Sequence, residues 1–123
     1  MATQHGPRGA LTVRLQIYSG RPDPEWTLEP DVADEVARRL RQAVSAEPVH
    51  APPEGGLGYR GFRITGGDAL GLPSELAVFR GVVSEVAGKQ TRHWLDATGF
   101  ERFLIEDARK RGFAEVLDAL GVK

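Results

Sequence analysis

Residues able to bind or catalyse are scattered along this 123-residue chain, and one short stretch concentrates them. The segment 18–26, YSGRPDPEW, holds a guanidinium at Arg21, a carboxylate at Asp23 and an indole at Trp26. It lies between a strand pattern and a helix pattern, where helix amides can hold an anion and Arg21 could add positive charge. Asp23 and Glu25 oppose this, because their carboxylates repel an anion and can pair with the guanidinium. The balance favours a rigid structural corner over an anion site, with two prolines fixing the backbone and the indole covering the core.

Acid–base chemistry has one candidate outside this loop, the imidazole of His93. Asp96 follows three residues later, and a hydroxyl could come from Ser19, Ser74 or Ser84, but the chain has no nucleophile-elbow pattern such as G-x-S-x-G. The three histidines stand in separate segments without metal-ligand spacing, so we expect no metal and no cofactor. The simplest interpretation of the imidazole is a strand residue beside a tryptophan.

Two further patterns are similar to binding motifs. Residues 56–61, GLGYRG, match GxGxxG, but they precede a strand pattern instead of opening a helix, so we interpret them as a turn. Arginines on four strand-like segments could share one sheet face with a tyrosine and form an anion-binding platform, although no RNP-like aromatic motif accompanies them. These arginines are Arg14, Arg60, Arg80 and Arg92. The candidate ligand-binding residues are Arg21, Asp23, Trp26, Tyr59, Arg60, Arg80 and His93.

Composition sets bounds on the class of protein. With 16 basic and 17 acidic residues and a net charge of -1, the chain does not favour a nucleic-acid backbone or an anionic membrane as partner. It contains no cysteine, which excludes disulfides, thiolate metal ligands and Cys nucleophiles. No apolar run has the length of a signal-peptide core or a membrane span, so we expect a cytoplasmic protein. The length predicts one domain over residues 10–123, after a disordered tail over residues 1–9.

Hydrophobic spacing predicts the elements of the first half. Residues 11–18 alternate apolar and polar side chains, which predicts a half-buried strand. Pro30 suits the first turn of a helix, and apolar residues then recur at helical spacing until another proline ends the pattern. A long stretch of turn formers leads to Tyr59–Thr65, a second strand with Phe62 and Ile64 towards the core.

The second half predicts two more strands and a helical end. Leu76–Val86 has the pattern of one long strand, and Thr91–Leu95 follows after a hairpin turn. Thr98 and Glu101 have the spacing of a capping box, so a helix should begin there. Gly112 is a natural stop or kink, after which the apolar pattern continues to the C-terminus.

This order of elements, β-α-β-β-β-α, predicts the α+β class. We expect a two-layer sandwich with a four-stranded, mostly antiparallel sheet and helices on one face. The helical crossover would make the first two strands parallel. The other face would be left to solvent or a partner. Side chains expected there are Thr12, Arg14, Gln16 and Tyr18, joined by Val78, Arg80 and Val82 provided that Phe79 faces the core.

The sequence favours a small non-enzymatic binding or accessory domain that uses the open sheet face and the Arg21 loop. Its partner would be another protein or a second copy of the chain in a homodimer. The alternative is an enzyme acting on a small anionic or carbonyl substrate, with Arg21, Arg60 or Arg80 as anchors and His93 or Asp23 moving a proton. A third possibility, nucleic-acid binding, predicts a salt-sensitive complex.

Overall fold

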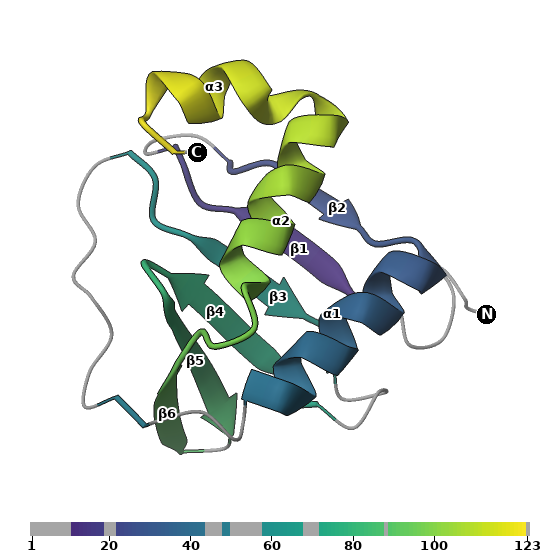
Figure 1. Ribbon diagram of the computed structural model, residues 1–123, viewed down its shortest axis with the longest axis vertical. Coiled ribbons are helices and arrows are strands. Elements are labelled where there is room, and N and C mark those ends of the chain that lie inside the picture. Colours follow the sequence, from purple (N-terminus) through teal and green to yellow (C-terminus); the bar gives the residue numbers. More distant parts are fainter. Residues whose placement is uncertain are drawn as a thin grey trace.

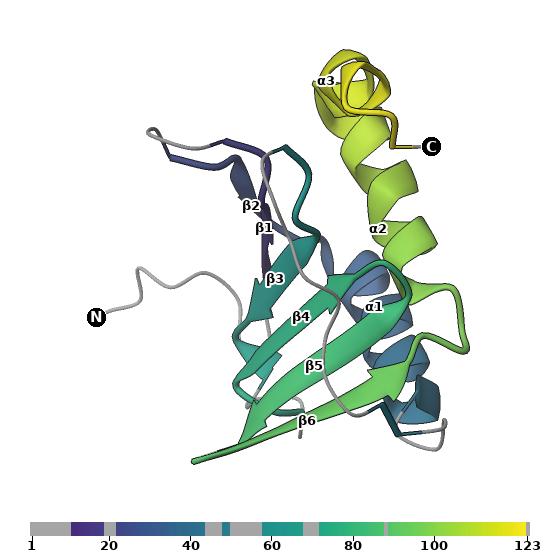
Figure 2. The same ribbon diagram turned by 90° about the vertical axis from the view of Figure 1, so that its left-hand side faces the viewer.

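The protein forms an antiparallel sheet with helices packed on one of its faces. The computed structural model describes residues 11–18, 22–43, 48–49, 58–67, 72–87 and 89–122. Its strands, in the order β2-β1-β3-β4-β5-β6 across the sheet, are β2 (Glu25–Thr27), β1 (Thr12–Leu15), β3 (Phe62–Thr65), β4 (Glu75–Phe79), β5 (Val82–Ala87) and β6 (Gln90–Leu95). The helices are α1 (Pro30–Ala43), α2 (Phe100–Ala108) and α3 (Ala114–Ala119). Figure 1 shows α1 and α2 crossing in front of the strands, and Figure 2 shows both on the same side of the sheet.

The α+β class and the single helical layer are as expected, but the sheet has six strands in place of four. One extra strand is β2, which lies inside the stretch that we expected to be a rigid loop. It pairs antiparallel with β1 through Val13 and Trp26. Two prolines did not prevent this, because both precede the three paired residues.

The expected parallel pairing of the first two predicted strands is wrong. The strand before α1 is β2, not β1, and the strand after it, β3, pairs antiparallel with β1. β2 and β3 therefore run in the same direction with β1 between them. The helical crossover still joins two parallel strands, but a third strand separates them.

The second extra strand arises because residues 76–86 form a hairpin and not one strand. β4 and β5 pair through Phe79 and Val82, and a two-residue turn of Arg80 and Gly81 joins them. Both turn residues have positive φ angles, 49° and 81°, as a type I′ turn requires. Arginine is uncommon at such a position, and the apolar residues on both sides of it fit a single strand. The turn was therefore not predicted.

This turn also corrects the expected facing of the hairpin. Val78 pairs with Phe62 and with Val83, and all three are buried beneath the helices. Ala77 and Phe79 consequently point to the opposite side, together with Val82. The condition under which Val78 would lie on the open face is therefore not met.

The core forms where the apolar side of the sheet meets the helices. Leu11, Val13, Leu15 and Ile17 are all buried, as the alternation predicted. Phe62 and Ile64 are also core residues, at 0% and 1% exposure, and their expected orientation is confirmed. The helices contribute Val36, Leu40, Phe100, Leu104 and Leu117 to the same cluster.

The start of α2 differs from the expected capping box. The carboxylate of Asp96 accepts hydrogen bonds from the backbone amides of Phe100 and Glu101, each at 2.8 Å. The Thr98 hydroxyl instead donates to a backbone carbonyl of α1 at 3.3 Å. Gly99, with a φ of 71°, tightens the turn so that Asp96 reaches the exposed amides.

Beyond α2 the chain bends at Gly112, as the sequence predicted. A π-helical turn, Arg109–Phe113, follows α2 directly, and Gly112 within it has a φ of 104°. α3 then continues at an angle to α2 (Figure 1). In the described ranges no helix combines the length and the apolar character that a bilayer crossing needs. The expected tail over residues 1–9 and the expected turn at residues 56–57 lie outside these ranges.

Candidate binding surface

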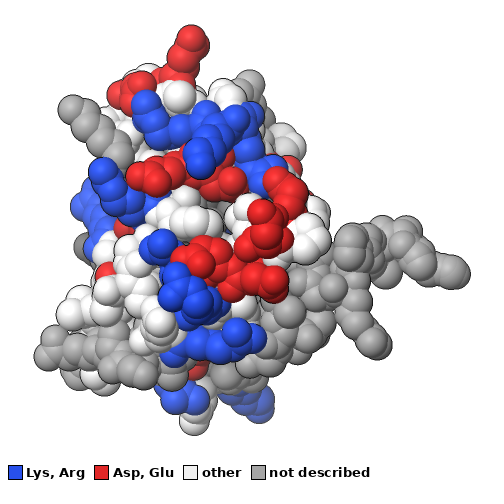
Figure 3. Space-filling view, turned by 45° about the vertical axis from the view of Figure 1, so that its right-hand side comes forward, with Lys and Arg blue, Asp and Glu red and all other residues white. Residues whose placement is uncertain are grey.

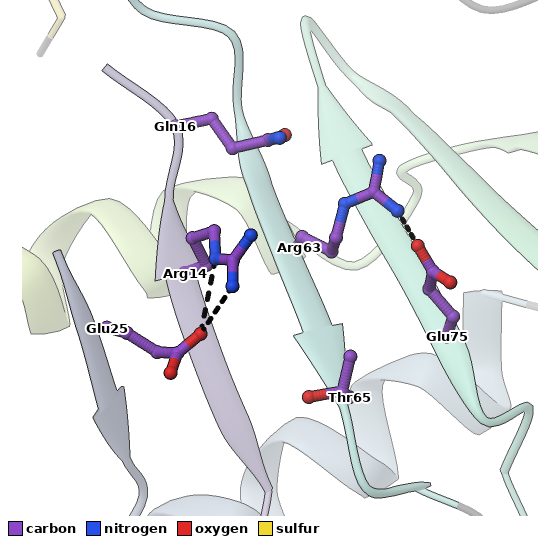
Figure 4. A pocket seen from close by; sticks show the side chains of 6 residues that line it. All are labelled: Arg14, Gln16, Glu25, Arg63, Thr65 and Glu75. Carbon is purple, nitrogen blue, oxygen red and sulfur yellow. Dashed lines mark hydrogen bonds and ion pairs between the residues drawn. The ribbon is translucent and has the colours of Figure 1, made fainter. Parts of the chain in front are cut away.

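The sheet face that points away from α1 and α2, here called the far face, contains a hollow of about 450 Å³. Side chains from four adjacent strands line it, and Figure 4 shows them projecting from the same side of the sheet. These are Arg14 and Gln16, Glu25, Arg63 and Thr65, and Glu75. We call this the charged hollow. These side chains share one face because successive residues of a strand point to opposite sides, and the intervening residues Val13, Leu15 and Ile64 point into the core.

Two ion pairs form the walls of the charged hollow. Arg14 donates to Glu25 from Nε and a terminal nitrogen at 3.2 and 3.0 Å, and Arg63 pairs with Glu75 (Figure 4). The two arginines stand directly opposite each other on β1 and β3, with a carboxylate on the outer side of each. All four side chains are 33–50% exposed. Exposed pairs of this kind contribute only about 0–1 kcal/mol, so each group can exchange its partner for a ligand at low cost.

A second hollow, of about 370 Å³, adjoins the first on the side of the β1–β2 loop. Arg14 and Glu25 line both, and Pro22 and Asp23 complete the second. The far face and the loop therefore form one continuous surface. Arg21, which we considered as the cation of this loop, lies outside the described residues.

Asp23 has a structural role in the loop. Its Oδ1 accepts hydrogen bonds from the backbone amides of Ile17 and Tyr18, at 3.0 and 2.7 Å. Its Oδ2 lies 3.8 Å from the guanidinium of Arg60, which also donates to the Tyr18 carbonyl at 2.6 Å. These contacts tie the end of β1 to the segment before β3 and match a self-satisfied corner, with Arg60 as cation.

Trp26 joins β2 to the end of α2. Its indole N–H donates to Asp107 at 3.2 Å, and its ring stacks on Phe113 with centroids 5.4 Å apart. Arg111 lies over the same ring and also binds Asp107 and Glu29. The indole is thus half-buried packing between sheet and helix, as expected of a core cover. Acidic and basic side chains alternate on the side of the molecule drawn in Figure 3, in keeping with such pairs.

Tyr59 and Arg80 lie near each other at the end of the β4–β5 hairpin. The Tyr59 hydroxyl donates to Glu101 at 2.5 Å, and the same carboxylate accepts from the backbone amides of Arg80 and Gly81 at 3.1 and 2.8 Å. Burial, and then the hydrogen bond to Glu101, raise the pKa of the Tyr59 phenol far above its ordinary value. The phenol therefore stays protonated and remains a donor at neutral pH.

His93 contacts none of these groups. Its Nδ1 is 2.8 Å from the hydroxyl of Ser84, its partner in register on β5. Asp96, which we considered as its acid, is occupied at the start of α2. Three strands separate β6 from β1, a span of about 19 Å at ~4.8 Å per strand, so His93 and Asp23 do not share a site. In the part of the chain that is described, no three acidic or histidine side chains converge as a metal site would need.

The sequence-derived candidates that the structure describes thus fall into four places. Asp23 lies with Arg60, and Tyr59 lies with Arg80. Trp26 and His93 each lie apart from the others. The charged hollow was missed except for Arg14 and Gln16, whose far-face position was expected. Strand register, which brings Arg14 opposite Arg63, gave no signal in the sequence.

Comparison with known proteins adds no relative. A scan against protein-family models, a search of curated proteins and a search of solved structures each return no match to this chain.

Proposed function

We propose that this chain is a non-enzymatic binding domain whose binding surface is the far face together with the adjoining β1–β2 loop. Its partner is a protein surface that carries acidic and basic side chains next to each other. A second copy of the chain carries such a surface itself, so it is the first partner to test. We propose that the chain works in the cytoplasm, because it has no cysteine and so needs no oxidising compartment in which to form disulfides.

The observation that carries this proposal is the charged hollow and its continuity with the loop. Two hollows that share Arg14 and Glu25 give a concave surface of mixed charge across β2, β1, β3 and β4. The ion pairs bring charges of both signs together on one surface before a partner arrives. Their exposure leaves the groups able to re-pair across an interface.

The charge pattern favours a protein over a nucleic acid. The hollow contains two arginines and two glutamates, so its lining has no net charge. A phosphate backbone gains its affinity from uncompensated cations, and each of these arginines already faces a carboxylate. A protein surface with both signs of charge can satisfy all four groups at once.

Self-association can be measured on the purified protein. Sedimentation velocity over a range of concentrations should detect a dimer that weakens as salt rises. The double variant Arg63→Glu with Glu75→Arg keeps an ion pair across the two strands but reverses its polarity, so the fold should persist while a complementary partner is repelled. The matched control is Arg102→Glu with Glu106→Arg, which reverses an exposed pair on α2.

If the chain is monomeric, the same pair of variants tests another protein partner. A partner identified by cross-linking should be purified and its affinity measured for wild type, the reversed hollow and the α2 control. We expect the reversed hollow to bind at least about tenfold more weakly, a loss of ~1.4 kcal/mol, and the control to bind like wild type. Equal binding by all three, to itself and to the purified partner, would refute the proposal.

A second candidate function rests on the contact between Ser84 and His93. An imidazole 2.8 Å from a serine hydroxyl can act as a base for it, which is the arrangement needed to attack an activated carbonyl. This retains His93 as proton carrier but without the arginine anchors or Asp23. Hydrolysis of a p-nitrophenyl ester above background, abolished by both Ser84→Ala and His93→Gln, would support it; activity that survives either change would end it.

A further inference from the structure

A separate hollow of about 360 Å³ lies where the C-terminal segment meets α2 and the β4–β5 turn. It is distinct from the charged hollow, since the two share no lining residue. The residues that matter for its chemistry are Tyr59, Arg80, Glu101, Ile105, Leu120 and Val122. We call it the turn hollow.

One side of the turn hollow is apolar. Ile105 of α2 and Val122 are buried at 7% and 9% exposure, and Leu120 stands beside them at 37%. Among the described residues, Leu120 and Leu95 are the two large apolar side chains that remain exposed. Leu120 therefore offers a surface that an apolar group could cover at a gain.

The polar side carries a carboxylate whose bonds are already made. Glu101 accepts hydrogen bonds from the Tyr59 hydroxyl, from the Arg80 amide and from the Gly81 amide. Both of its oxygens are engaged, so it serves the turn and is not free to pair with a cation. The phenol of Tyr59 is likewise used as a donor to it.

Arg80 is the one cation among the described residues that line the hollow. Its guanidinium lies 5.1 Å from the centre of the Phe79 ring and makes no ion pair with any residue of the described ranges. Its backbone has a φ of 49°, a left-handed conformation that asparagine or glycine adopts at lower cost. Arginine is thus less suited to this turn than asparagine or glycine, but it places a cation beside an apolar surface.

We propose that the turn hollow binds a small monocarboxylate with a short apolar body, its carboxylate on the guanidinium of Arg80 and its body against Ile105 and Leu120. Arginine presents paired N–H groups that match a planar carboxylate. The fixed charge of Glu101 opposes a dianion such as phosphate, so one negative charge is favoured over two. The volume suits a molecule at the small end of the ligand range.

The test uses a ¹⁵N-labelled full chain titrated with hexanoate and followed by amide chemical shifts. We expect saturable shifts at Gly81, Gly121 and Val122, with a dissociation constant on the order of 1 mM. Hexanamide, which lacks the charge, acetate, which lacks the body, and inorganic phosphate should each bind at least about tenfold more weakly. No saturable shift below about 10 mM hexanoate, or equal binding of phosphate, would overturn the proposal.

The discriminating variant is Arg80→Asn, with Arg80→Gly as its companion. Both residues suit the turn, so each variant should unfold at or above the wild-type temperature while losing at least about tenfold in hexanoate affinity. Arg102→Asn removes another exposed arginine, one that does not line the turn hollow, and should bind like wild type. Unchanged affinity in the Arg80 variants, or unfolding of both, would show that the guanidinium serves another purpose.

Discussion

Replacing Glu101 by alanine should show how much of the fold depends on one carboxylate. Glu101 lies in the first turn of α2 and accepts bonds from the Tyr59 hydroxyl and from both amides of the Arg80-Gly81 turn. It therefore links the helix layer, the segment before β3 and the β4–β5 hairpin. Alanine keeps the helix but removes all three acceptors.

The size of the effect can be worked out from these bonds. The phenol of Tyr59 is largely buried, and leaving it without an acceptor costs about 1–3 kcal/mol. The two turn amides can recover water, so we assign them together about 1 kcal/mol. The sum is about 3 kcal/mol, which is a large part of the 5–15 kcal/mol typical of a domain. For 123 residues the unfolding entropy is about 0.26 kcal/mol/K, so the midpoint should fall by about 12 °C.

Urea unfolding followed by the fluorescence of Trp26 and Trp94 measures this change. Glu106→Ala, an exposed glutamate of the same helix, is the control and should change the free energy of unfolding by less than about 0.5 kcal/mol. In a double-mutant cycle, Tyr59→Phe should lose most of its cost when Glu101 is already alanine. A loss below about 0.5 kcal/mol for Glu101→Ala, or additive costs in the cycle, would refute this account of the carboxylate.

Three further predictions concern the fold. Gly61→Ala should destabilise by about 3 kcal/mol or more in urea unfolding, because its φ is 89° and a Cβ would overlap the carbonyl oxygen of Val78; near-wild-type stability would contradict that geometry. Asp96→Ala should cost about 1–2 kcal/mol of thermal stability and Thr98→Ala much less. A larger cost for Thr98→Ala than for Asp96→Ala would show that the capping box, and not Asp96, stabilises the start of α2. The raised pKa of Tyr59 keeps the folded phenol neutral while the unfolded phenol ionises from about pH 10 upwards, so this contribution is complete below pH 10 and falls above it by up to ~1.4 kcal/mol per pH unit. Tyr59→Phe should reduce that alkaline loss, and an unchanged pH profile would argue against the burial of the phenol.

The sequence predicted only part of the candidate surface. Period 2 in residues 11–18 correctly divided β1 into a buried side and a far-face side with Arg14 and Gln16. It could not say that Arg63 would stand opposite Arg14 or that Glu25 would flank it. Those neighbours depend on strand order and register, to which turns far away in the chain contribute.

The sequence by itself determined the elements whose cause is local. Alternating apolar residues made β1, Pro30 began α1, and Gly112 bent the C-terminal helix, because each effect arises from backbone geometry or from one face seeking the core. Only the tertiary structure decided the hairpin at Arg80-Gly81, since the amides of this turn are held by Glu101, about twenty residues later. The same holds for the charged hollow, whose four ionised groups come from four strands and meet only when the sheet is paired. Contacts between residues far apart in the sequence leave no periodic pattern in it, so they could not be predicted from the sequence.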